Sequence, residues 1–428
     1  MPHIIDPSPW LILPFAGLLL SIAISPFLFK HWWEHHYPKV SVGLGLFVAL
    51  YYIVVFHAGE RVGHTMLEYV SFICLIGSLF VVSGGIHITV AGQAKPLANI
   101  VFLLVGAILA NVIGTTGASM LLLRPWIRMN KLRYAAFHTV FFIFIISNTS
   151  GCLTPIGDPP LFLGYLKGVP FWWDLQMLWQ PWLLVIGLLL ATFFVFDSIS
   201  FARVPKYLRE KKAAHEKFTF AGLQNIAWLA LILTCVFLPS PWREIGMVVA
   251  AAGSYFTTQK YIHISNHFNF GPIKEVAWLF LGIFATMVPA LDYLGVHARE
   301  LGISSPISFY YFTGALSGVL DNAPTYLTFF AASISQLTQP GSNIPLDINR
   351  LSDVTRYIAL GEKELIAISL GAVWFGAMTY IGNGPNLMVK AIAEQAGVKA
   401  PHFLEYIYKY SLPILLPILI LAGTILFH

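Results

Sequence analysis

Ten apolar segments, each about as long as a bilayer is thick, follow one another along the chain and restrict what it can fold into. A helix needs about 20 apolar residues to cross a membrane, and only helices and closed barrels satisfy every backbone hydrogen bond in lipid. The pattern predicts an all-α polytopic membrane protein whose first segment is a retained helix, since it lacks a basic start and a small-residue cleavage site. The segments are 10–29, 40–57, 67–91, 135–166, 180–203, 220–238, 242–258, 274–296, 363–396 and 403–427.

The low charge content supports this interpretation. Only 11% of the 428 residues are charged, whereas a soluble domain carries about 25%. The basic residues lie in short loops between apolar segments, which indicates membrane topology and not nucleic-acid binding. The isolated cysteines Cys74, Cys152 and Cys235 form neither a disulfide framework nor a metal motif. The sequence also lacks HExxH and GxSxG motifs, so we do not expect an enzyme.

Two further stretches, 97–123 and 307–336, are apolar but are interrupted at their centres by small and polar residues. Each predicts a re-entrant helical hairpin, and a long kinked span is the alternative. When residues 203–219 are placed in the cytoplasm, most of the Lys and Arg residues fall inside, as the positive-inside rule requires. This arrangement places both termini outside.

The chain contains an internal repeat. Residues 151–160 align with residues 376–385 at matching Gly, Thr, Ile, Gly and Pro positions, and Gly106-Ala107-Ile108 aligns with Gly314-Ala315-Leu316. Each half then has five spans, one of them broken, and one re-entrant hairpin. Five crossings are an odd number, so the second copy is inverted relative to the first.

The repeat divides the chain into three parts. We predict a first inverted repeat over 1–202, a cytoplasmic basic linker over 203–219 and a second inverted repeat over 220–428. Inverted repeats with hairpins and interrupted helices are the architecture of secondary transporters.

One span in each half is predicted to break near its middle. Proline removes a backbone donor and clashes with the preceding turn, and irregular backbone at membrane depth is tolerated only beside protein or a water-filled cavity. The freed carbonyl oxygens, together with side-chain oxygens, are suitable ligands for a hard cation such as sodium. The residues that break the two helices are Gly157, Pro159 and Pro160, then Gly382, Gly384 and Pro385.

Polar residues beside the breaks and hairpin centres are the candidates for ion binding and proton exchange. Asp158 and Asp321 are the strongest, because a charged carboxylate at mid-membrane costs about 2.5–3.5 kcal/mol on insertion scales; a helix cap is the alternative role. Asp197 and Asp292 lie nearer the ends of spans, where placement at the membrane interface is expected. The other candidates are Ser147, Asn148, Thr149, Ser150, Thr154, Asn322, Thr379 and Asn383, with Asn111, Thr115, Thr116 and Pro324 at the hairpin centres.

Two of these segments resemble motifs of the ion-transporter superfamily. SNTSGCLTPIGDPP (147–160) is similar to the signature of NhaD-type sodium/proton antiporters, and LDNAPTYL (320–327) resembles the second-hairpin motif of the antiporter and arsenite branches. The resemblance implies a scaffold and a transport domain, elevator-type movement and a homodimer. Its polar site residues carry over onto Ser147, Asn148, Thr149, Asp158, Asp321 and Asn322. Pro159-Pro160 departs from the Val-Thr-Thr typical of these antiporters, and sequences with this variant are often labelled citrate transporters.

These observations leave two main functional hypotheses. The first is a sodium/proton antiporter of the bacterial inner membrane, which exchanges sodium or lithium ions for protons at Asp158 and Asp321. It would contact membrane lipids and would use no cofactor beyond the transported ions. The alternative is a sodium-coupled citrate or dicarboxylate transporter, and an arsenite exporter is a third. The breaks and hairpin centres lack Lys and Arg, which disfavours an anion, although helix N-termini and backbone amides can bind carboxylates.

Overall fold

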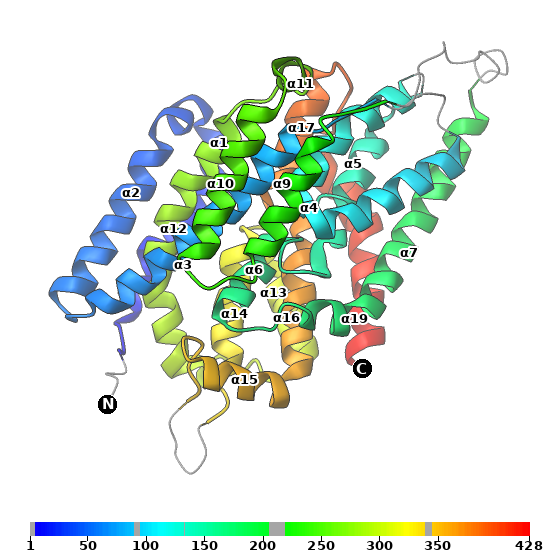
Figure 1. Ribbon diagram of the computed structural model, residues 1–428. Helices are drawn as coiled ribbons and strands as arrows, with labels where there is room; N and C mark the ends of the chain where they lie inside the picture. The colour runs from blue at the N-terminus through cyan, green and yellow to red at the C-terminus, as the bar shows by residue number, and fades with distance from the viewer. Residues whose placement is uncertain (1–4, 90–94, 132, 205–218, 339–344) are drawn as a thin grey trace.

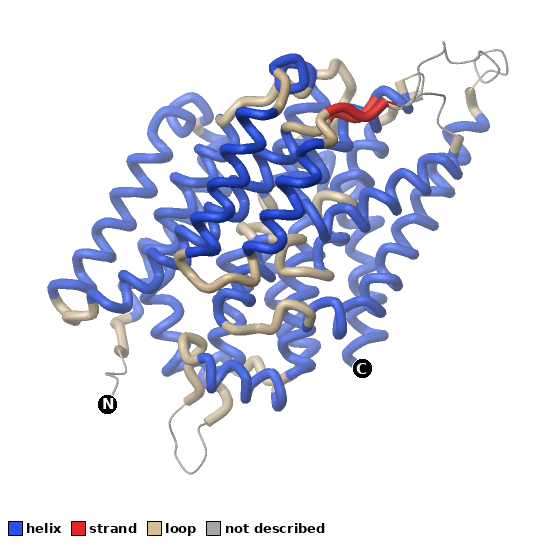
Figure 2. Tube along the Cα trace, viewed as in Figure 1, coloured by secondary structure: helices blue, strands red, loops and turns tan. Residues whose placement is uncertain are grey.

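The computed structural model describes residues 5–89, 95–131, 133–204, 219–338 and 345–428. Within these ranges the fold is helical apart from one short antiparallel strand pair, β1 (His87–Thr89) with β2 (Thr219–Ala221), shown in red in Figure 2. Seven of the described helices are long and apolar enough to cross a membrane. The prediction of an all-α polytopic membrane protein is therefore confirmed. Most of the predicted linker 203–219 lies outside the described residues.

Six helices pack together as what we call the first bundle (Figure 1). Its core is aromatic, since the Phe72 ring stacks on Phe280 with centroids 4.7 Å apart and Tyr69 meets Phe284 edge-on. The predicted span 220–238 is shorter than expected, because its first residues pair as β2. The helices of the first bundle are α1 (Leu13–Leu28), α2 (Lys30–Val54), α3 (Gly59–Gly84), α9 (Gln224–Cys235), α10 (Trp242–Thr257) and α12 (Gly271–His297).

Helix α4 (Pro96–Asn130) folds back on itself at Gly114, whose φ of +76° is readily adopted only by glycine. The Asn99 side chain donates a hydrogen bond of 2.8 Å to Asn130, 31 positions later in the sequence. In a straight helix these residues would be about 46 Å apart. Phe102 also stacks on Trp126, with ring centroids 5.4 Å apart. The two arms of α4 therefore lie side by side as a hairpin, and the long kinked span is not formed.

The second interrupted stretch also turns back. Helices α13 (Pro306–Ser317) and α14 (Asn322–Ile334) are joined by four residues, and Pro324 lies in the first turn of α14. At the open end, Gln336 Nε2 donates a hydrogen bond of 2.6 Å to Ile303 O. The re-entrant placement of both hairpins in a membrane stays a prediction.

Both predicted helix breaks are present. In the first, α5 (Ala136–Ile145) and a 3-10 turn, η2 (Thr149–Cys152), precede α6 (Pro159–Lys167). In the second, α16 (Glu362–Phe375) and η4 (Gly376–Met378) precede α17 (Gly384–Gln395). The two breaks have the same close backbone approach, because an ideal Cβ on Gly157 would lie 2.3 Å from Gly151 O, and one on Gly382 would lie 2.6 Å from Gly376 O. The domain limits drawn from the repeat stay predictions.

The hairpins and broken helices form the second bundle with α7 (Trp173–Ala202) and the C-terminal helices. The bundles meet where α3 contacts α4 and α6, and where α12 contacts α14. This contact surface lies beside the breaks, and it therefore positions the site described below. The remaining elements are η1 (Pro9–Ile12), α11 (Lys260–Ser265), η3 (Ala298–Leu301), α15 (Leu351–Leu360), α18 (Phe403–Tyr406), the π-helix η5 (Ile407–Leu415) and α19 (Leu416–Phe427).

Candidate functional site

The two hairpins and the two breaks converge on one carboxylate. Asp158 is 1% exposed and precedes the first residue of α6, to whose backbone its side chain makes no capping hydrogen bond. Its Oδ1 accepts hydrogen bonds from Thr115 Oγ1 at 2.7 Å and Asn383 Nδ2 at 3.0 Å, and its Oδ2 accepts one from Asn322 Nδ2 at 2.5 Å. We call these four residues the Asp158 cluster. Each of the four interrupted elements contributes one member.

Every member of the cluster lies at a helix N-terminus. Thr115 begins the second arm of α4, Asp158 precedes α6, Asn322 is the first residue of α14, and Asn383 precedes α17. A helix N-terminus carries about half a positive charge from its unpaired amides, and it is a ready-made binding site for anions. Four such termini therefore surround one carboxylate, and their helix dipoles favour negative charge at this point.

Several amides at these termini are not free to bind a ligand. Pro159 and Pro160 at the start of α6 have no N–H. Thr115 N donates a hydrogen bond of 2.8 Å to Gly157 O, and Ala323 N donates one of 3.0 Å to Asp321 Oδ1. The electrostatic field of the helix ends, more than their amides, therefore distinguishes this point.

The direct partners of Asp158 are neutral. They are one hydroxyl and two amides, and the described residues contain no ion pair to Asp158. A hydrogen bond to a charged group contributes about 1.5–3 kcal/mol, so three donors offset part of the cost of burying the charge. The carboxylate is held in place without a counter-ion, and its charge is available to a ligand.

Two side-chain oxygens beside the cluster are buried without a hydrogen-bond partner among the described residues, Asn148 Oδ1 and Asn322 Oδ1. Asn148 is fixed through its amide, which donates to Asn386 Oδ1 at 2.7 Å. The side chains of Asn148 and Asn322 both lie next to Gly376. An ideal Cβ on this glycine would lie 3.2 Å from Asn148 Oδ1 and 3.5 Å from Asn322 Nδ2. Unpaired amide oxygens next to a carboxylate form a donor set that suits a hard cation.

A small cavity of about 30 Å³ adjoins Asp158. It lies between α3, the turn of α4 and the start of α6, and Leu79, Thr116 and Phe162 are among its lining residues. A cavity of this size can hold one water molecule or ion. The side chain of Asp158 is therefore next to a space that a small ligand could enter.

Several predicted site residues stabilise the breaks and do not contact Asp158. Apart from Ser147, which bonds to another side chain, the hydroxyl groups in the breaks bond to backbone atoms, as short polar side chains often do. An ion-binding role for these residues stays a prediction. The bonds are Ser147 Oγ with Ser119 Oγ (2.8 Å), Thr149 Oγ1 to Phe144 O (2.6 Å), Ser150 Oγ to Ile146 O (3.1 Å), Thr154 Oγ1 to Asn111 O (2.6 Å), Leu153 N to Asn111 Oδ1 (2.9 Å) and Gly382 N to Thr379 Oγ1 (3.2 Å).

Asp321 has a different position from Asp158. It is partly exposed, and its Oδ1 accepts a hydrogen bond of 3.0 Å from Ala323 N, so it caps α14. The structure places the neighbouring Asn322 against Asp158, and it does not bring the two aspartates into direct contact. The cap is the alternative role considered for Asp321 from the sequence.

Residues 6–427 match a family model whose description is "putative citrate transport". The chain belongs to this putative citrate transport family. A comparison with curated proteins gives no match. This match supports the resemblance to citrate transporters. It does not support the resemblance to NhaD-type sodium/proton antiporters. This member of the putative citrate transport family is thus a transporter by family, with several helices long enough to span a membrane.

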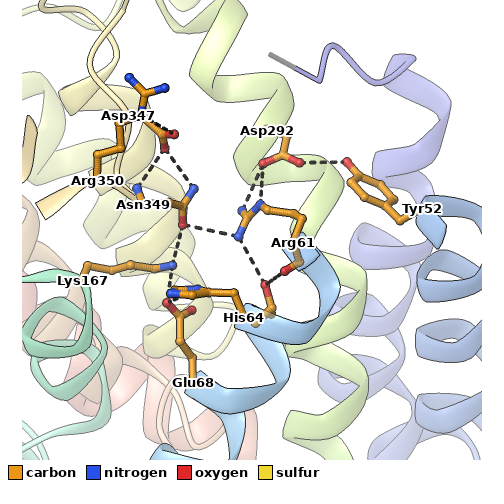
Figure 3. Close-up of polar contacts among 10 residues, drawn as sticks. Tyr52, Arg61, His64, Glu68, Lys167, Asp292, Asp347, Asn349 and Arg350 are labelled. Carbon is orange, nitrogen blue, oxygen red and sulfur yellow. Dashed lines mark hydrogen bonds and ion pairs between the residues drawn. The ribbon is translucent and has the colours of Figure 1, made fainter. Parts of the chain in front are cut away.

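The sequence analysis missed a second polar cluster in this transporter, at the other end of α6 (Figure 3). Lys167 Nζ lies 2.7 Å from Glu68 Oε1 and donates to Asn349 Oδ1 at 2.8 Å. Arg61 donates to the same Asn349 oxygen at 3.3 Å and pairs with Asp292 at 3.0 Å. We call these five residues the Lys167 network. Asp292 is held in this ion pair, and its expected placement at the membrane interface stays a prediction.

Asp197 is buried inside the protein, and its expected depth at the membrane interface stays a prediction. It pairs with Arg133, contacts His138 Nε2 at 3.2 Å and accepts a hydrogen bond of 2.8 Å from Asn99. The contacts join α7 to α5 and to the open end of the α4 hairpin. Asp197 is therefore a structural anchor of the second bundle.

Proposed function

We propose that this protein is a cation-coupled citrate or dicarboxylate transporter that binds its cargo at the Asp158 cluster. The observation that carries the proposal is the meeting of four helix N-termini around a single carboxylate. Helix N-termini bind carboxylates without Lys or Arg, so the lack of basic residues in the breaks does not argue against an anionic substrate. Membership of a putative citrate transport family supports the same substrate class.

A cation explains how an anion can bind next to Asp158. A sodium ion between Asp158 and the unpaired oxygens of Asn148 and Asn322 would neutralise the aspartate. A substrate carboxylate could then bind in the positive field of the four helix N-termini without facing an uncompensated negative charge. Each ligand would bind weakly alone and more tightly with the other, and such a binding free-energy coupling is reciprocal. This mutual dependence would couple substrate uptake to the sodium gradient.

The experiment is uptake of labelled citrate and succinate into proteoliposomes that contain the full chain. We expect uptake to require an inward sodium or lithium gradient and to fall to the background level when potassium replaces these ions. The control variant is Glu405→Gln, which removes an exposed carboxylate paired with Lys409 at 3.1 Å and should transport normally. If neither anion is taken up under any cation or proton gradient, the proposal is wrong.

Sodium/proton antiport is the second candidate. It is favoured by the neutral partners of Asp158, because a carboxylate without a fixed counter-ion can bind either a cation or a proton. The same proteoliposomes test it with an internal pH-sensitive dye and no citrate. Proton movement that follows the addition of sodium or lithium would favour antiport over carboxylate transport.

A further inference from the structure

Helix α6 connects the two polar clusters. It has nine residues, with Asp158 at its N-terminal cap and Lys167 as its last residue. Nine helical residues span about 13 Å, and a helix this short is close to a rigid rod. A shift of one end of α6 therefore displaces the other end.

The two ends of α6 contact different bundles. Asp158 bonds to residues of α4, α14 and the second break, which all belong to the second bundle. Lys167 bonds to Glu68 on α3, and through Asn349 it reaches Arg61, whose partner Asp292 lies on α12. Figure 3 shows Asn349 between the two basic side chains. The Lys167–Glu68 pair is therefore an ionic contact between the bundle that holds the site and the first bundle.

The Lys167 network is balanced in charge and largely buried. Two cations face two carboxylates, and the Lys167 and Glu68 side chains are only 2% and 9% exposed. The shared Asn349 is oriented by its own amide, which donates to Asp347 Oδ1 at 3.0 Å. A network in which each charge has its partner offers no net charge to a ligand. Its geometry is that of a structural contact and not of a second binding site.

We propose that Lys167 and Glu68 are positioning residues, which hold the helix that carries Asp158 against α3. Alternating access requires the site to change its contacts with the rest of the protein, and the pair must separate if the second bundle moves relative to the first. A buried charge that loses its partner is costly, so the pair favours the arrangement seen here. The transport consequence rests on the proposed function, whereas the contact itself does not.

The first test links the pair covalently. The Lys167→Cys/Glu68→Cys protein, in a Cys74→Ala background, is joined with a bifunctional, reducible thiol reagent. We expect citrate uptake to fall at least tenfold on linking and to recover with reductant. The matched control is Lys409→Cys/Glu405→Cys, which replaces a Lys–Glu pair at 3.1 Å within the C-terminal helices of the second bundle. Linking the control should leave uptake unchanged, and unchanged uptake in the linked Lys167 protein, or equal loss in both, would overturn the proposal.

The second test does not need a transported substrate. Hydrogen–deuterium exchange of residues 159–170 is measured in the full-length protein and in Glu68→Gln. We expect exchange in this segment to rise at least tenfold, because Gln leaves Lys167 without its carboxylate, whereas exchange in α5 should not change. Unaltered exchange in 159–170 would exclude the positioning role, even if wild-type protein takes up no citrate and the proposed function fails.

Discussion

The two ends of α6 place similar side chains in opposite situations. At the N-terminal end, one buried carboxylate is surrounded by neutral donors and by four helix N-termini. At the C-terminal end, two cations and two carboxylates neutralise one another. Burial is similar at both ends, so burial does not distinguish a binding site from a structural contact. The difference lies in whether the buried charge already has a partner.

The two ends also differ in what a ligand would have to displace. A cation that reaches Asp158 meets a carboxylate and two unpaired amide oxygens, and it need not break an ion pair. A ligand at Lys167 would first have to separate that residue from Glu68 and Asn349. Removal of charge should therefore reduce transport at one end of α6 and stability at the other.

Asp158→Asn is expected to have the largest effect. The substitution keeps the shape of the side chain but removes the charge that a cation would bind, and citrate uptake should fall at least about 100-fold, since interactions with a charged group contribute about 1.5–3 kcal/mol each. The melting temperature in detergent should fall modestly, because the Asn amide replaces one of the two oxygens that accept hydrogen bonds from Thr115, Asn322 and Asn383. Folded protein that does not transport citrate separates the loss of function from a loss of stability. Wild-type uptake in this variant would remove Asp158 from the mechanism.

Glu68→Gln tests the ion pair at the C-terminal end of α6. It leaves Lys167 as a buried charge without its carboxylate, and breaking a buried pair in this way costs about 3–5 kcal/mol. The double variant Lys167→Met/Glu68→Met removes both charges and should recover most of the lost stability. Thermal unfolding in detergent measures the stability of the single variant and of the double variant. Equal stability of Glu68→Gln and wild type would show that the pair is not a significant contact.

Gly157→Ala tests whether the first break must keep its shape for the Asp158 cluster to form. An ideal Cβ on this residue would lie 2.3 Å from Gly151 O, so the backbone next to Asp158 must move. We expect uptake to fall about tenfold and stability to fall by about 1–3 kcal/mol, the usual cost of overpacking. Gly187→Ala in α7, where the added Cβ meets nothing within 4 Å, is the control and should transport normally.

Asp321→Ala should have the smallest effect and compares the two aspartates directly. Loss of the bond to Ala323 N removes a helix cap, which costs about 1 kcal/mol. Citrate uptake should stay within about twofold of wild type, measured beside Asp158→Asn. If uptake is instead abolished, Asp321 has the exchange role that the sequence predicts.

The sequence predicted the helical membrane fold and included Asp158 among the candidate site residues. The length of the apolar segments gave the membrane helices, and the Gly and Pro residues near 157 and 382 located the breaks. It could not distinguish Asp158 from Asp321, because both follow the same local pattern beside an interruption. Only the packing of the four elements shows that Asp158 faces the others, while Asp321 folds onto its own helix.

The Lys167 network could not be predicted for a different reason. Lys167 and Glu68 are 99 positions apart, and Lys167 and Asn349 are 182 apart. Each of these residues, taken alone, resembles an ordinary polar residue at the end of a span. The pairing depends on which ends of which helices meet, and local patterns contain no information about that contact.

The turn in α4 has a consequence for locating the loops by experiment. A 35-residue apolar helix would normally be counted as one crossing, yet the arms of α4 return to a common end because the backbone reverses at Gly114. Reporter fusions placed before Pro96 and after Asn130 should therefore give the same compartment. The predicted sidedness of every later segment depends on this reversal, so the same comparison tests the predicted topology of residues 131–428.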